Sequence, residues 1–276
     1  MIGLFAQDAG APEAALGWVL RIAAVGVIVY GIEMLAIRRI LRDDGLMGWE
    51  IGSLRFLYFT RGWSAKFWNA WLRYPVFRMI LVVRVVLGFV VLTIPAQWIL
   101  HPALILPTWW ALFLFTKRNH YGQDGADQML LIVFTAAALV SLHVTPLTCR
   151  LALWVVALQC ALAYTAAGIA KLTAGGWRDG RFLPGIFATQ IYGMPGVHRI
   201  LSEHRSLAVG LSWLVMLWES LFPLAFLLPW PFGLGFVAVG VGFHLANAVT
   251  MGLGSFFVAF LSTYPALIFC LRTKGW

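Results

Sequence analysis

The feature that most constrains this chain is a series of long apolar runs with almost no charge. An α-helix needs about 20 apolar residues to cross the hydrocarbon core of a bilayer, and several runs reach that length. Charged residues make up only 11% of the 276 residues, against about 25% in soluble domains. This composition excludes a disordered chain, a coiled coil and an ordinary water-soluble enzyme. A transmembrane β-barrel would instead show alternating segments of about ten residues. We therefore expect an all-α, polytopic membrane bundle that forms a single domain over residues 1–276.

The apolar runs predict about eight membrane helices. They span residues 14–37, 77–100, 102–117, 127–145, 147–170, 206–228, 231–250 and 254–271. Either 102–117 or 254–271 could instead be a re-entrant segment. The stretches 38–76 and 171–205 mix aromatic residues, Gly and Pro with Arg and Lys, which is typical of short amphipathic helices at the membrane surface.

The net charge of +9 is explained by the loops. With eight helices, fifteen Lys and Arg residues fall in loops on one side of the membrane, and the positive-inside rule makes that side cytoplasmic. No basic cluster lies on a soluble domain, so we expect the lipid bilayer as a partner and no nucleic acid.

The loop between the predicted helices 102–117 and 127–145 contains Asn119, His120, Asp124 and Asp127. One interpretation is a plain turn, in which Asp127 favours the N-terminal end of the next helix. The other is that His120, with one of the two aspartates, reaches a cavity at the membrane face and holds or moves a proton.

A second group of residues lies near the end of the predicted helix 147–170. Tyr164, Gly168 and Lys171 follow the i, i+4, i+7 spacing of one helix face. Gly168 would let another helix or a flat ligand approach closely. Lys171 is either a lysine that snorkels to the interface or a partly buried amine that acts as a base.

A third group, His244, Asn247 and Met251, shares one face of the predicted helix 231–250. It indicates either the wall of a cavity or an interhelical hydrogen bond. The charged residues inside the runs predict internal ion pairs, such as Arg84 with Glu33 or with Glu219. No metal-binding pattern is found, because the histidines form no HxxxH pair and the three cysteines lack ligand spacing.

Taken in order, these three segments resemble the horizontally transferred transmembrane (HTTM) proteins, the bacterial relatives of the membrane domain of vitamin K-dependent γ-glutamyl carboxylase. The stretch 164–172, followed by Trp177, resembles the carboxylase segment that carries its catalytic lysine. The stretches 118–127 and 244–265 resemble two further blocks of the family. The resemblance covers residues 14–272, and Ala170 stands where the carboxylase has a second lysine.

The resemblance implies a membrane enzyme of the bacterial inner membrane with a reduced, vitamin K hydroquinone-like quinone as cofactor. Lys171 would be the base, while His120 and His244 would stabilise or relay charge. The candidate substrate- or cofactor-binding residues are Tyr164, Gly168, Asn119, Asp124, Asp127, Asn247, Met251 and Trp177. The alternative is a non-catalytic membrane partner of a separate protein, which would dock on 38–76 and 171–205. A transporter is disfavoured because no inverted repeat is seen.

Overall fold

The computed structural model describes residues 11–119 and 125–274, and within these ranges the chain is helical without a β-strand. The contacts divide the chain into two compact units, unit 1 over residues 1–152 and unit 2 over residues 153–276. Each unit is described by itself below. This division does not test the prediction that residues 1–276 form a single membrane domain, which therefore stays a prediction.

Five described segments are long and apolar enough to cross a membrane, so this is an integral membrane protein. They are α2 (Pro12–Ala36), α7 (Val76–Thr93), α10 (Pro146–Thr173), α15 (Trp230–Met251) and the pair α16 (Gly254–Leu261) with α17 (Tyr264–Thr273). Three further predicted membrane helices are present but shorter: α8 (Pro102–Arg118), α9 (Ala126–Ser141) and α14 (Arg205–Ser220). The all-α bundle is confirmed, whereas the structure does not establish eight spans.

Two predicted helices end seven and eight residues earlier than expected, and a proline follows in each case. The helix expected over 77–100 ends at Thr93, two residues before Pro95. The helix expected over 206–228 ends at Ser220, and a 3-10 helix, η3 (Phe222–Phe226), contains Pro223. Proline lacks the N–H that a continuing helix needs, and it disfavours a helical conformation in the residue before it.

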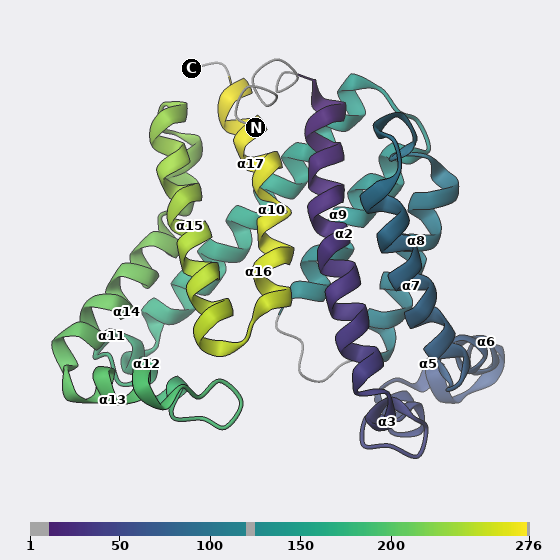
Figure 1. Cartoon of the computed structure of the whole chain (residues 1–276), viewed down its shortest axis with the longest axis horizontal. Helices are drawn as coiled ribbons and strands as arrows, with labels where there is room; N and C mark the ends of the chain where they lie inside the picture. Colours follow the sequence, from purple (N-terminus) through teal and green to yellow (C-terminus); the bar gives the residue numbers. More distant parts are fainter. Residues whose placement is uncertain (1–10, 120–124, 275–276) are drawn as a thin grey trace. The chain divides into compact units, whose positions relative to one another are not determined.

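α2, α7, α8 and α9 form the body of unit 1 (Figure 1). α2 packs against α7 and α9, and α8 packs against the same two helices. Glycines at the α2–α7 contact allow this close approach, since a Cβ on Gly88 would lie 2.8 Å from Ile28. The Arg21 guanidinium donates to the Ile94 carbonyl at 2.7 Å and to that of Leu92, so it satisfies free carbonyls at the end of α7.

The outer face of α7 is apolar and exposed. Between residues 79 and 90 its exposed residues are Met79, Val82, Val83, Val86, Phe89 and Val90. A continuous apolar stripe of this kind has no stable place in water. We take it as a surface that faces lipid.

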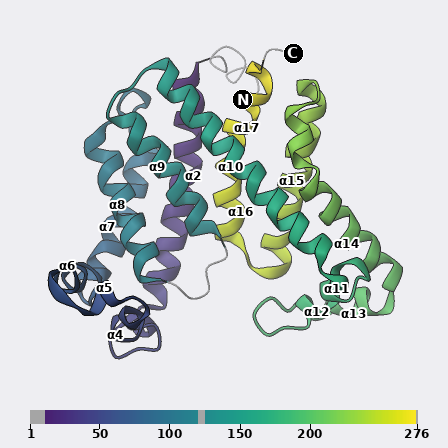
Figure 2. The same cartoon turned by 180° about the vertical axis from the view of Figure 1, so that it is seen from behind.

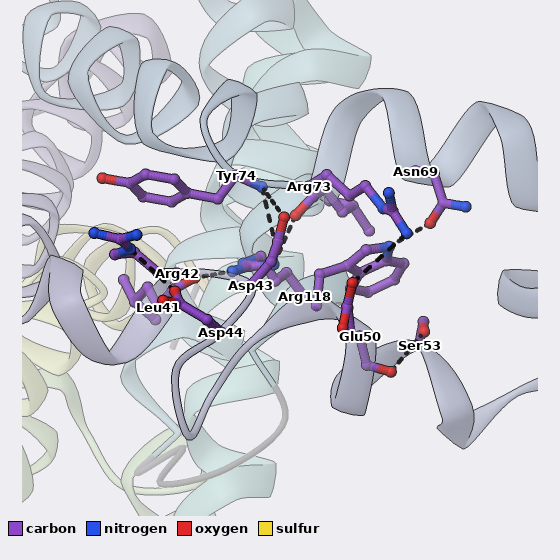
Figure 3. A network of polar contacts seen from close by, with 12 residues as sticks. Leu41, Arg42, Asp43, Asp44, Glu50, Ser53, Asn69, Arg73, Tyr74 and Arg118 are labelled. Carbon is purple, nitrogen blue, oxygen red and sulfur yellow. Dashed lines mark hydrogen bonds and ion pairs between the residues drawn. The ribbon is translucent and has the colours of Figure 1, made fainter.

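The stretch 38–74 folds as short helices, as expected for an interfacial segment. They are α3 (Arg38–Leu41), α4 (Trp49–Gly52), η1 (Ser53–Arg55), α5 (Leu57–Thr60) and α6 (Gly62–Leu72). Arg118, the last residue of α8, holds both ends of this segment (Figure 3). It donates to the carbonyls of Leu72, at 2.6 Å, and Leu41, and it lies 3.8 Å from Asp43, which also accepts from the Tyr74 N–H. The segment is therefore anchored to unit 1 at its start and at its end.

Unit 2 is built around α14 and α15. Three short helices, α11 (Gly175–Arg178), α12 (Phe182–Phe187) and α13 (Pro195–Glu203), contact α14. They cluster beyond the C-terminal end of α10 (Figure 2). α16, α17 and η3 pack on α15. The stretch 171–205 thus contains the short helices that the sequence predicts.

Candidate functional site

Unit 2 contains a cavity of about 550 Å³ with largely apolar walls, here called the unit 2 cavity. Its volume lies within the range of about 300–1,000 Å³ that is usual for small-molecule sites. α10, α14, α15 and α16 form its sides, and residues from 177–201 add a further wall. The polar residues of its lining are Tyr164, Lys171, Tyr192, Glu219, His244, Asn247 and Thr250. A few polar groups in an apolar cavity suit an amphiphilic ligand.

The Lys171 ammonium and the Glu219 carboxylate form an ion pair in the wall of this cavity. Lys171 Nζ donates to both carboxylate oxygens, at 2.7 and 3.0 Å. The Glu219 side chain is 3% exposed and that of Lys171 20%. Nζ also lies 5.5 Å from the centre of the Trp177 ring, a cation–π contact. A lone buried charge is costly, so the two opposite charges stabilise each other in an apolar setting.

Gly168 allows α14 to approach α10 closely enough for this pair to form. A Cβ at residue 168 would lie 2.5 Å from the Ser220 backbone nitrogen and 2.9 Å from the Glu219 carbonyl carbon. Of the two neighbours predicted for Gly168, a helix or a flat ligand, the structure shows the helix. Gly168 therefore acts on the site through the position of Glu219.

A buried hydrogen-bonded chain lies in another part of the cavity wall. The Tyr164 hydroxyl lies 2.7 Å from His244 Nε2 and 2.8 Å from the Tyr264 hydroxyl. The His244 ring stacks on Phe260, with centroids 4.5 Å apart, and meets the edge of Phe256. All three polar residues are less than 5% exposed. The arrangement fixes the orientation of the imidazole.

The short helices of the stretch 171–205 supply one wall of the cavity. Trp177 of α11, together with apolar residues of α12 and α13, belongs to the lining. The turn after α11 is held by Asp179, which accepts from the Arg181 N–H at 3.0 Å and from the Arg181 guanidinium at 2.7 Å. The Arg181 backbone N–H is the main cause that lowers the pKa of the Asp179 carboxyl, and the guanidinium adds to it. This wall therefore has a defined conformation next to Lys171.

Apart from Gly168, which lies at the contact of α10 with α14, the predicted site residues fall into three groups. Six line the unit 2 cavity: Tyr164, Lys171, Trp177, His244, Asn247 and Met251. Asn119 and Asp127 belong to unit 1, and His120 and Asp124 lie outside the described residues.

The predicted pairing of Arg84 with Glu219 needs correction. Arg84 is fully buried and lies 3.5 Å from Asp127, with its guanidinium over the rings of Tyr30 and Phe115. Glu219, one of the two partners expected for it, pairs with Lys171 instead. Asp127 is in the first turn of α9, where the helix dipole also favours a carboxylate.

Two residues of the site were not assigned to it from the sequence. Glu219 was expected to form a structural ion pair with Arg84, and Tyr264 carried no predicted role. A signal for Glu219 does exist, because it is the only charged residue between 206 and 228 and a buried carboxylate requires a cation. For Tyr264 there is no comparable signal.

The residues described over 11–119 and 125–274 contain no group of three or more His, Cys, Asp or Glu that could hold a metal ion. The fold and the cavity define the class of the protein: an all-α integral membrane protein with an apolar, amphiphile-sized site in unit 2. None of the family models, curated proteins or solved structures with which the chain was compared matches it. Its function is therefore argued from the site itself.

Proposed function

We propose that this protein is an HTTM-type membrane enzyme, similar to the vitamin K-dependent carboxylase, that acts on a quinol-type or other lipid-soluble redox substrate in the bacterial inner membrane. The observation that carries the proposal is the Lys171–Glu219 ion pair in the wall of an apolar cavity. An acid–base pair next to an apolar, ligand-sized space suits proton removal from an amphiphile.

The residues present fit a reduced quinone. Aromatic and aliphatic walls suit its ring and tail, and the ion pair and His244 offer polar contacts. When bound, such a group would supply a weakly acidic hydroxyl and the electrons for reduction of a second substrate. Water exclusion by the walls would strengthen the electrostatic interactions inside.

Lys171 acts as a base only when it is an amine, and Glu219 is the neighbour that can hold its proton. The carboxylate oxygens lie 2.7 and 3.0 Å from Nζ, so this transfer needs no movement of the helices. The neutral amine then accepts the proton of the ligand hydroxyl. The pair changes from zero to one net positive charge, with an ammonium at Lys171 and a carboxylic acid at Glu219. That positive charge offsets the negative charge left on the ligand.

The test is to purify the protein in a mild detergent and identify the lipid-soluble molecules that remain bound by mass spectrometry. Wild type is compared with Lys171→Ala and with Lys171→Met combined with Glu219→Gln, which leaves no unpaired buried charge. Lys117→Ala is the matched control, because Lys117 also lies in the last turn of its helix but belongs to unit 1.

We expect a quinone or polyprenyl compound in wild type and in the control, and its loss from both Lys171 variants. A protein that carries only bulk phospholipid in every variant would contradict the proposal. That result would favour the alternative, a non-catalytic membrane partner of a separate protein.

A further inference from the structure

The hydrogens of the Tyr264–Tyr164–His244 chain can be assigned by counting donors and acceptors. Each phenol carries one proton, and neutral imidazole carries one on either nitrogen. Within residues 11–119 and 125–274, Tyr264 has the Tyr164 hydroxyl as its hydrogen-bond partner, and His244 Nδ1 has none. Which ring nitrogen of His244 carries the proton therefore depends on the direction of the hydrogen bonds between Tyr264, Tyr164 and His244.

One direction uses stronger hydrogen bonds than the other. If Tyr264 donates to Tyr164 and Tyr164 donates to His244 Nε2, both phenol protons bind strong acceptors and only the Nδ1–H lacks a partner. In the reverse arrangement His244 Nε2 and Tyr264 both donate to the Tyr164 oxygen, the Tyr164 proton goes to the thiol sulfur of Cys160, and Nδ1 has no donor. Thiol sulfur is only a weak acceptor. The first direction is preferred, and it places the imidazole proton on Nδ1.

The surroundings of His244 favour the neutral ring that this count assumes. Its ring contacts in the structure are those of Tyr164, Phe243, Phe256 and Phe260. A buried imidazolium would need an opposite charge beside it, and these contacts supply none.

We infer that Tyr164, supported by Tyr264, holds His244 as the Nδ1–H tautomer, and that this N–H binds an acceptor oxygen on the ligand of the unit 2 cavity. His244 is 1% exposed and is part of the cavity lining. The inference rests on the proposed function only in taking this cavity as the ligand site. It makes Tyr164 a positioning residue and His244 a selector for ligands with a carbonyl or similar oxygen over hydrocarbons of the same shape.

The tautomer is measured by NMR on protein labelled with ¹⁵N-histidine, where protonated and unprotonated ring nitrogens differ strongly in shift. The His244 signal is identified by its loss in His244→Asn. His198 is an internal reference, because its Nδ1 lies 3.0 Å from the Pro184 carbonyl, which can only accept. We expect a protonated Nδ1 at both histidines. A neutral His244 protonated at Nε2 would overturn the inference.

The ligand contact is tested with menadione, which carries two carbonyl oxygens, and with 2-methylnaphthalene, which has the same ring system without them. Menadione should shift the His244 Nδ1 signal and leave that of His198 unchanged, and 2-methylnaphthalene should shift neither. Asparagine places its amide nitrogen near the position of Nδ1, and glutamine near that of Nε2. We expect His244→Gln to weaken menadione binding about tenfold, the size of one hydrogen bond, and His244→Asn to change it about twofold or less.

The outcomes separate this inference from the proposed function. Menadione that binds without moving the Nδ1 signal, or that binds equally to wild type and His244→Gln, overturns the inference alone. Absence of saturable menadione binding to wild type overturns both. Tyr164→Phe gives a further check, because it should abolish the preference for Nδ1–H, whereas a purely structural role for Tyr164 would leave the tautomer unchanged.

Discussion

Replacing Gly168 by alanine tests whether the close packing of α10 on α14 holds the Lys171–Glu219 pair together. The added carbon would lie 2.5 Å from the Ser220 nitrogen, about 0.9 Å short of an ordinary 3.4 Å contact. The atoms it meets include backbone, so α14 itself must move. Overpacking of this kind costs about 1–3 kcal/mol.

The same shift acts on the ion pair. Moving α14 away by about 0.9 Å would take the Nζ–Oε2 distance from 2.7 Å to beyond the usual range for N–H···O bonds. We therefore expect Gly168→Ala to lower the melting temperature in detergent and to reduce the bound lipid-soluble compound, as the Lys171 variants do. Tryptophan fluorescence on heating and mass spectrometry of the bound compound measure the two effects.

Gly210→Ala is the matched control for this prediction. Gly210 lies within α14, and nothing lies within 4 Å of a Cβ built there. Alanine in an open helix position should stabilise by about 0.5–1 kcal/mol. If Gly168→Ala instead melts at or above the wild-type temperature and keeps its bound compound, α14 does not depend on that glycine and the reasoning fails.

Two further predictions concern the buried charges. Lys171→Met and Glu219→Gln should each lower the free energy of unfolding. Lys171→Met should lower it by about 3–5 kcal/mol, since it leaves a buried carboxylate without its cation. The double variant should recover much of that loss, and additive losses in thermal unfolding would disprove the pairing. Arg84→Leu should also cost about 3–5 kcal/mol because it removes the cation beside Asp127, which is 2% exposed. Adding Asp127→Leu should restore stability, and a double variant no more stable than Arg84→Leu would contradict this pairing.

The helices of this protein could be predicted well from the sequence because the signal is local. A run of apolar residues is visible without knowledge of its neighbours, and α10 and α15 lie within a few residues of their expected ends. The predicted helix ends are wrong where the apolar run continues past a proline that the helix cannot include. Residues 94–100 are apolar except for Gln97 and residues 221–228 are apolar throughout, yet Pro95 and Pro223 end the regular helices.

The candidate site was predictable only in part, for a physical reason. Helical spacing places Tyr164 and Lys171 on one face, and both line the cavity. The partners of that face are separated from it by 48 residues, for Lys171 and Glu219, and by 100 residues, for Tyr164 and Tyr264. No period in the sequence connects residues on different helices. Their pairing follows from the packing, which here depends on one glycine.

Two ion pairs, Arg84–Asp127 and Lys171–Glu219, differ in their access to a ligand, and this difference is our reason for proposing the ligand site in unit 2. Arg84 and Asp127 are 0% and 2% exposed, so their neighbours enclose both charges. A ligand could reach that pair only by displacing packed side chains, and we expect its loss to appear as lost stability. Lys171 is 20% exposed and lies in a cavity wall, so its ammonium meets a space that a ligand can fill. Its partner Glu219 is 3% exposed and remains fixed. One anchored charge and one accessible charge form an acid–base pair that can exchange a proton with a ligand without unfolding the bundle around it.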